Sequence, residues 1–462
     1  MRKHCLSLFI KGGLSALKVG TNGVGASSLI KTSYKKLVQF LSDTYDVVTF
    51  PFDWRLQLNE TARNLKNEVE RLLEYKQPIK IIGHSMGGVL VRDFIITYPD
   101  TWKRLNESKD FRLLFLGSPL GGSFRIPAVL FGQDAIISKL SKIDIFHTKK
   151  ELINMFSQMP GILSLLPITT DAENDFANPA TWEKMRVEDG SWPVPPKAKC
   201  DEFAKYRKGI LDGSKDIDYT NMVYVAGKDK ATPCGYKIEE TTAGKELVFL
   251  STAEGDQSVT WDSGIPQTMI KNGTVYYTNA SHGALANDTA LFKGIAEIIA
   301  YGYTNSNAFS KKRPAVRSQQ KLFRSAQVND FDLSPEGIEK TLLGLPDETG
   351  TISTSDLPME VSICHGDLHY ASYPLLAGHF YKDGILNAEK SIDRSERSKR
   401  CLVQENGYHL VAVVIGGTGL TCSCKTKVIW KTAFAACCLV HQPAAQEKNS
   451  GNCTAQQPSS NI

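Results

Sequence analysis

A serine between two glycines, placed directly after an apolar run, constrains this chain more than any other feature. Residues 83–87 have the sequence Gly-His-Ser-Met-Gly, and the mostly apolar run 78–82 precedes them. The glycines allow a turn so sharp that the backbone passes close to its neighbours, where a Cβ atom would clash. Residues 88–96 then continue with a helical apolar pattern. This order predicts a strand, a tight turn that carries Ser85, and a helix whose first amides point towards it.

The apolar pattern on both sides of this motif predicts a mostly parallel sheet with helices on both faces. Helical patterns at 34–42, 56–75 and 288–301 alternate with short strand-like runs. The expected strands are residues 45–50, 78–82, 111–116, 221–227, 247–250 and 273–277. Strands that alternate with helices are typical of parallel sheets. Together with the turn at Ser85, the order predicts an α/β-hydrolase fold.

The rest of the chain divides by composition. The strand–helix alternation stops at about 120–196, where we expect a lid inserted into a domain spanning 1–304; a plain packing subdomain is the alternative. Residues 305–335 are polar and basic, as in a linker. Residues 336–400 are expected to form a small α/β or partial domain, and 401–462 an irregular tail.

A serine nucleophile needs a base and an acid that orients the base, in the chain order serine, acid, histidine. His282 follows an expected strand within a loop of small residues and is the predicted base. Asp256, beside Gly255, is the preferred acid, and Asp229 is the alternative. In this hypothesis the backbone N–H of Met86, the residue after the serine, stabilises the oxyanion.

Charge and hydropathy exclude several classes of function. The net charge of +5 is small for 462 residues, and no dense basic stripe with aromatic residues is present, so nucleic-acid binding is not expected. No apolar run approaches the roughly 18–20 residues that span a bilayer, so no transmembrane segment is expected. The N-terminal apolar run ends early, at Lys11, and no clear cleavage site follows. We therefore expect a cytoplasmic protein.

No metal or cofactor is expected. The sequence His-Gly-Asp-Leu-His at 365–369 alternates possible ligands, but no matching outer ligand is evident. The cysteines at 422, 424, 437 and 438 do not have the spacing of a zinc knuckle.

Several motifs together resemble the lecithin:cholesterol acyltransferase-like group of α/β-hydrolases, in the same order, over about residues 10–300. They are Phe-Pro-Phe-Asp-Trp-Arg at 50–55, the turn at 83–87, Leu-Gly-Ser-Pro-Leu-Gly-Gly at 116–122, Leu-Leu-Pro at 165–167, Gly-Asp at 255–256 and Ser-His-Gly at 281–283. The resemblance implies acyl transfer or hydrolysis on lipid or other acyl esters, with Ser85, Asp256 and His282 as a triad. It also implies that Asp53 and Trp54 lie near the mouth of the site and bind substrate. A lid in such a protein could contact a membrane surface transiently.

The resemblance has one departure. The family usually opens with a strand that ends in a Pro-Gly or His-Gly loop, which donates a second oxyanion N–H. Here Lys11-Gly12-Gly13-Leu14 resembles the region after that loop. Either the first family strand is missing, or Gly12 and Gly13 replace the loop. If the strand is missing, the alternative function is a catalytically impaired scaffold that serves as a binding or regulatory module.

Overall fold

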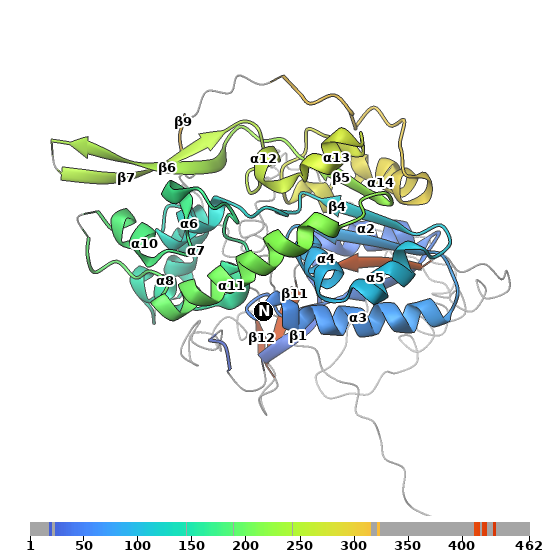
Figure 1. Cartoon of the computed structure of the whole chain (residues 1–462), viewed down its shortest axis with the longest axis horizontal. Helices are drawn as coiled ribbons and strands as arrows, with labels where there is room; N and C mark the ends of the chain where they lie inside the picture. Colours follow the sequence, from blue (N-terminus) through green and yellow to red (C-terminus); the bar gives the residue numbers. More distant parts are fainter. Residues whose placement is uncertain are drawn as a thin grey trace, which may run out of the picture.

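The computed structural model has a parallel sheet at its centre (Figure 1). It describes residues 18–20, 24–144, 146–187, 189–242, 244–315, 321–323, 411–415, 418–422 and 428–430. In spatial order, the strands of this sheet are β2 (Asp46–Phe50), β10 (Val411–Ile415), β3 (Ile79–His84), β4 (Arg112–Leu116), β5 (Met222–Ala226) and β8 (Val275–Tyr277). All five neighbouring pairs are parallel. The predicted α/β fold class is confirmed.

Helices cover both faces of this sheet because its central strands are buried on both sides. Leu113 and Phe115 belong to one core cluster, while Leu114 and Leu116 belong to the other, as the two-residue period of a strand requires. The first cluster packs against α3 (Leu58–Glu74), α4 (Met86–Thr97) and α5 (Pro99–Asn106). The second packs against α2 (Lys31–Ser42) and α14 (Thr289–Tyr301).

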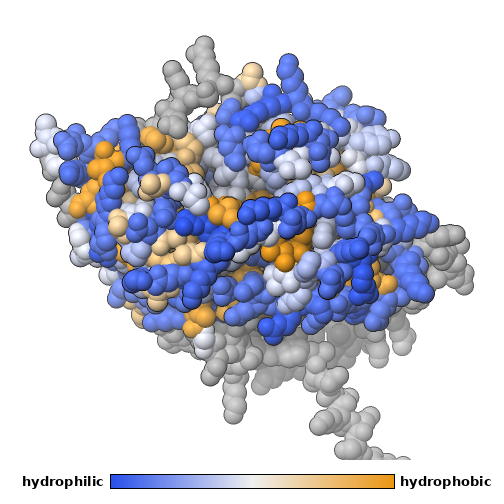
Figure 2. Space-filling model, in the orientation of Figure 1, coloured by the Kyte–Doolittle hydropathy of each residue, from blue (hydrophilic) through white to orange (hydrophobic). Residues whose placement is uncertain are grey.

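A helical region is inserted between β4 and β5; it covers the range predicted as a lid, about 120–196, and extends beyond it to residue 216. Its helices are α6 (Arg125–Leu130), α7 (Ala135–Ile143), α8 (Lys149–Phe156), α9 (Pro160–Leu163), α10 (Pro179–Met185) and α11 (Lys197–Gly213), with short 3₁₀ turns η2 (Ala172–Asn174) and η3 (Ser214–Asp216). Figure 1 shows most of them beside one end of the sheet, with α11 running back towards α4. On the face seen in Figure 2, hydrophilic residues dominate and hydrophobic ones form small separate groups. Whether the region acts as a lid stays a prediction.

The strand expected at 247–250 lies outside the central sheet, so that expectation was wrong. It is part of β7 (Gly244–Thr252), which forms a long antiparallel hairpin with β6 (Thr232–Thr241). The short strand β9 (Lys321–Leu322) pairs with the other edge of β7. Strands β6, β7 and β9 thus form a separate three-stranded sheet, and β7 makes no ladder with the central one.

The region after residue 401, predicted to be irregular, contributes strands to two sheets. Its strand β10 lies between β2 and β3. Its strands β11 (Thr418–Cys422) and β12 (Val428–Trp430) form a small antiparallel sheet with β1 (Val24–Leu29). The predicted domain boundaries stay predictions, and residues 336–400 lie outside the described residues. The motif at 365–369 lies outside them too.

The remaining short elements precede or follow β8 in the chain. They are α12 (Trp261–Gly264), α13 (Gln267–Lys271) and the 3₁₀ turn η4 (Ala284–Ala286). Among the helices of the described ranges, none combines the length and the apolar composition that crossing a membrane would require.

Gly161, in the inserted region, packs closely against the backbone of the loop after β2. A Cβ atom on Gly161 would lie 2.0 Å from the carbonyl oxygen of Trp54 and 2.6 Å from that of Leu56. We predict that Gly161→Ala lowers the free energy of unfolding by about 1–3 kcal/mol, because a backbone contact cannot yield to the methyl group. Urea unfolding measures this change.

Gly209 provides the matched control. It is exposed on α11, and a Cβ atom there meets nothing within 4 Å. Gly209→Ala should raise the free energy of unfolding by about 0.5–1 kcal/mol through helix propensity alone. Equal effects of the two substitutions would contradict the close packing at Gly161.

Candidate active site

Ser85 occupies the turn between β3 and α4 in a strained backbone conformation. Its φ is 55° and its ψ is −129°, which is uncommon for a residue with a Cβ atom. A Cβ atom on Gly83 would lie 2.8 Å from the Cα of Gly88, so the strand and the helix are in backbone contact. The Ser85 N–H donates to the carbonyl of Leu116 on β4, at 3.0 Å. The packing therefore holds Ser85 in the turn that the sequence predicted.

The structure brings Ser85, His282 and Asp256 together in one chain of hydrogen bonds. His282 Nε2 lies 2.8 Å from Ser85 Oγ, and His282 Nδ1 lies 2.8 Å from Asp256 Oδ2. A carboxylate only accepts, so Nδ1 carries the proton in this bond. In the neutral imidazole, Nε2 is then free to accept the hydrogen of the serine hydroxyl.

Asp256 is buried and held by backbone amides. Its side chain is almost inaccessible, with 1% of the residue exposed. Oδ1 accepts from the N–H groups of Ser258 and Val259, at 3.0 and 2.8 Å. Its backbone carbonyl accepts from the His282 N–H at 2.8 Å, so the two loops are joined twice. These bonds leave Oδ2 directed at the imidazole.

The alternative acid, Asp229, lies in a neighbouring loop and makes different hydrogen bonds from those of Asp256. Its Oδ1 accepts from the N–H groups of Lys230 and Ala231, in a local turn. Its own N–H donates to the carbonyl of Gly255 at 2.6 Å. Asp229 therefore supports the loop that carries Asp256 and does not contact His282 through these bonds.

An arginine from the inserted region holds the same loop, which the sequence did not predict. Arg125 Nη1 donates to Ser258 Oγ at 2.7 Å, and Nε donates to Asp134 Oδ2 at 2.7 Å. Ser123 Oγ donates to the Ser258 carbonyl. Ser258 lies 133 residues after Arg125 and 135 after Ser123, so no local pattern could indicate these two contacts. They attach the inserted helices to the acid loop.

His84, beside Ser85, supports the backbone of His282. Its Nε2 lies 3.0 Å from the His282 carbonyl oxygen, and its Nδ1 lies 2.8 Å from the hydroxyl of Tyr34. The carbonyl can only accept, so Nε2 carries the proton and Nδ1 accepts from Tyr34. Burial, with repulsion from His282, lowers the pKa of His84 to about 3. His84 is therefore neutral above that pH.

The remaining predicted site residues are Met86, Asp53 and Trp54. Met86 is the first residue of α4, so its N–H is among those without an intrahelical acceptor. Asp53 accepts hydrogen bonds from the side chain and the N–H of Arg55. Trp54 belongs to the core and is 1% exposed. Substrate binding by Asp53 and Trp54 stays a prediction.

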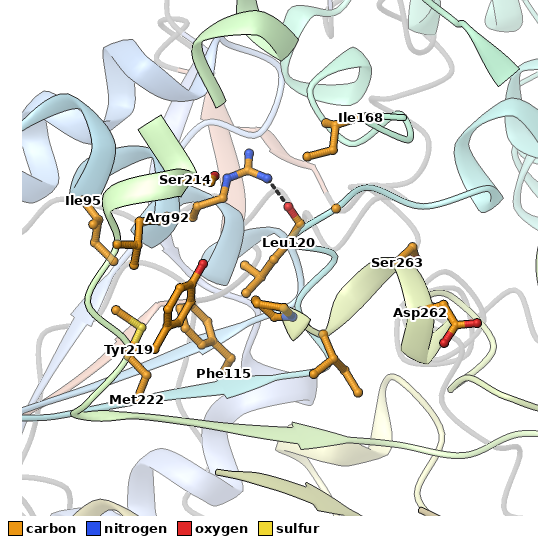
Figure 3. A pocket seen from close by; sticks show the side chains of 14 residues that line it. Arg92, Ile95, Phe115, Leu120, Ile168, Ser214, Tyr219, Met222, Asp262 and Ser263 are labelled. Atoms are coloured by element: carbon orange, nitrogen blue, oxygen red, sulfur yellow. Dashed lines mark hydrogen bonds between the residues drawn. The ribbon is translucent and has the colours of Figure 1, made fainter. Parts of the chain in front are cut away.

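A small pocket lies between α4, the central sheet and the segment after α11 (Figure 3). Its volume is about 210 Å³, and its walls include Ile95, Phe115 and Met222. Arg92 donates to the carbonyl of Leu120 at its wall. The residues of the serine–histidine–aspartate chain do not line it, so it is separate from the candidate reaction site.

The pKa of His84 gives a prediction about acid stability. The unfolded chain binds a proton on this histidine near pH 6.5, whereas the folded chain binds it only near pH 3. The free energy of unfolding should therefore fall as the pH decreases from about 6.5 towards 3. The variant His84→Gln keeps a donor for the His282 carbonyl. In this variant the difference in bound protons between the unfolded and the folded chain should be smaller by about one, so the free energy of unfolding should fall less steeply. Urea unfolding at stepped pH measures the slopes.

Ser85→Ala is the control, because it leaves both partners of His84 in place. It should keep the slope of the wild type. A slope for His84→Gln as steep as that of Ser85→Ala would show that His84 is not the group that titrates.

Comparison with known proteins agrees with the resemblance seen in the sequence. Residues 22–227 match the family model for lecithin:cholesterol acyltransferase. The phosphatidylcholine-sterol acyltransferase of Mus musculus is 34% identical over 88 residues, which is 18% of this chain and 19% of that protein. The Homo sapiens protein is 36% identical over 89 residues, with the same shares. The match thus spans about a fifth of the length of these relatives.

The chain is also similar, at low TM-scores, to parts of two solved structures. A chain of the Tle4–Tli4 complex has a TM-score of 0.37 at 13% identity, covering 54% of this chain and 68% of that one. Mature lipase BlEst2 of Bacillus licheniformis has a TM-score of 0.26 at 11% identity, covering 53% and 75%. The resemblance to the acyltransferase family is confirmed over residues 22–227, which include Ser85 but neither Asp256 nor His282.

Proposed function

We propose that this chain, which resembles the lecithin:cholesterol acyltransferase family over the region that includes Ser85, is a lipid acyltransferase or esterase with a serine nucleophile. The observation that carries the proposal is the hydrogen-bond chain from Ser85 Oγ through His282 to Asp256. The family match supports an acyl ester as the substrate class. It does not extend to the histidine and the aspartate, so the geometry alone supports their roles.

The geometry is suited to a two-step acyl transfer. Ser85 Oγ attacks the ester carbonyl while His282 Nε2 takes the hydroxyl proton, and the buried Asp256 carboxylate stabilises the imidazolium. The tetrahedral intermediate collapses, the bond to the alcohol breaks, and His282 returns the proton to the leaving oxygen. Water or a second alcohol then gives a proton to His282 and attacks the acyl-enzyme. Ser85 regains its hydrogen as the acid or the new ester leaves.

The start of α4 can stabilise the negative charge of the intermediate. The Met86 N–H lies at the helix N-terminus directly after the nucleophile, where the helix dipole also favours an anion. One such donor contributes roughly a hundred- to a thousandfold in rate.

The inserted helices are the proposed lid. They follow β4 directly, and Arg125 on α6 bonds to the loop of Asp256. A lid attached in this way would couple access of lipid to the position of the acid. It would also be the part that contacts a membrane surface.

A fluorophosphonate probe tests the proposal, because it phosphonylates only an activated serine. We predict that the wild-type chain is labelled at Ser85 and that Ser85→Ala is not. Asp256→Asn should lower the labelling rate by about 10³–10⁴-fold, because its amide would impose the wrong imidazole tautomer. Peptide mass spectrometry locates the label.

Asp229→Asn is the matched control, since this aspartate lies in the neighbouring loop without bonding His282. It should change the labelling rate less than tenfold. Absence of labelling in the wild type would instead favour the catalytically impaired scaffold.

Product analysis separates hydrolysis from transfer. With vesicles of a phospholipid carrying a labelled acyl chain, we predict release of labelled fatty acid. When an acceptor alcohol is added to the vesicles, an acyltransferase should produce labelled ester at the expense of the acid. Ser85→Ala should give neither product, and fatty acid formed equally by Ser85→Ala would refute the assignment.

A further inference from the structure

We propose that Val411–Ile415 is a built-in strand ligand, which fills a slot between β2 and β3 and on which the reactivity of Ser85 depends. The sheet topology gives the place of this strand, whereas its effect on Ser85 rests on the function proposed above.

The register shows that β10 is bonded on both edges. Val411 is paired with Asp46 on β2 and with Ile79 on β3, and Ile415 is paired with Phe50 and Gly83. Both ladders are parallel and continuous over the five residues of β10. A strand from near the end of the chain is thus inside the sheet rather than on its edge.

The slot needs an occupant because β3 is buried along its whole length. All six residues of β3 are buried, and β4 pairs with only one of its edges. An empty slot would leave the N–H and C=O groups of the other edge without bonds in a buried place, which is costly. The neighbouring strand β2 is bonded within this sheet only through β10, among the strands described. Without β10, β2 and β3 would stand about 10 Å apart, two strand spacings.

The slot adjoins the nucleophile. Ile415 is paired with Gly83, two residues before Ser85. The position of the turn therefore depends on a ladder that residues 411–415 complete on one side and β4 completes on the other.

A second attachment strengthens the first. Strand β11 pairs with β1, from Val24 with Cys422 to Leu29 with Thr418. Helix α2 begins two residues after β1 and carries Tyr34, which binds His84 beside the nucleophile. Strands β10 and β11 are thus paired with the strand that leads to Ser85 and with the strand that leads to the helix of Tyr34.

A second sequence in the chain resembles β10 and the residues around it, because it too is a short, mostly apolar run followed by two glycines. Residues 410–417 are Leu-Val-Ala-Val-Val-Ile-Gly-Gly, and residues 8–13 are Leu-Phe-Ile-Lys-Gly-Gly. The second lies outside the described residues. Residues 411–415 have the observed register in the sheet and are therefore the proposed occupant.

The test is a proline in the middle of β10, in the full-length chain. Val413→Pro removes a ladder N–H, whereas Val413→Thr keeps it and is the matched control. Hydrogen exchange of the amides in β2 and β3 should become at least tenfold faster in Val413→Pro, while those in β5 and β8 stay protected. Labelling of Ser85 by the fluorophosphonate should slow at least tenfold. A synthetic peptide of residues 405–424, added in excess, should restore both.

The outcomes distinguish this proposal from the proposed function. Unchanged protection of β2 and β3 in Val413→Pro would overturn it and would point to residues 8–13 as the occupant. Loss of protection throughout the chain without recovery on adding the peptide would overturn the idea of a preformed slot. If protection behaves as expected but even the wild type is never labelled, the slot stands and the proposed function fails.

Discussion

The contact between the backbones of Gly83 and Gly88 is the constraint on which the candidate site depends. It lets β3 and α4 meet at an angle that forces Ser85 into a positive φ. The strain is sustained because β3 is buried and bonded on both edges, so the turn cannot relax without disrupting the sheet. The conformation of Ser85 thus depends on the whole sheet and not only on residues 83–87.

The position of His282 also depends on residues from distant parts of the fold. The backbone of His282 is held by the Asp256 carbonyl at its N–H and by the His84 ring at its carbonyl. His84 is in turn fixed by Tyr34 from α2, and the Asp256 loop by Arg125 from the inserted region. Elements from both faces of the sheet therefore determine a hydrogen bond of 2.8 Å to Ser85.

Local patterns in the sequence were enough for the turn at Ser85, for the alternation of strands and helices, and for the order in which the candidate residues occur. They failed where the partner is distant. The apolar run at 247–250 has the pattern of a strand, but nothing in it specifies pairing with β6 rather than β5. The run at 411–415 is equally strand-like, yet its neighbours lie more than three hundred residues earlier. Arg125 and Ser258 meet only through the fold.

The place of β10 in the sheet has a consequence for synthesis. During translation β2 and β3 leave the ribosome early, but the strand that joins them follows roughly 300 residues later, after tens of seconds at about 5–20 residues per second. Until then the nascent chain carries two adjacent strands with open edges, the arrangement that invites pairing with another chain. A chain truncated before residue 411 would keep these edges open, so we expect it to aggregate rather than to fold.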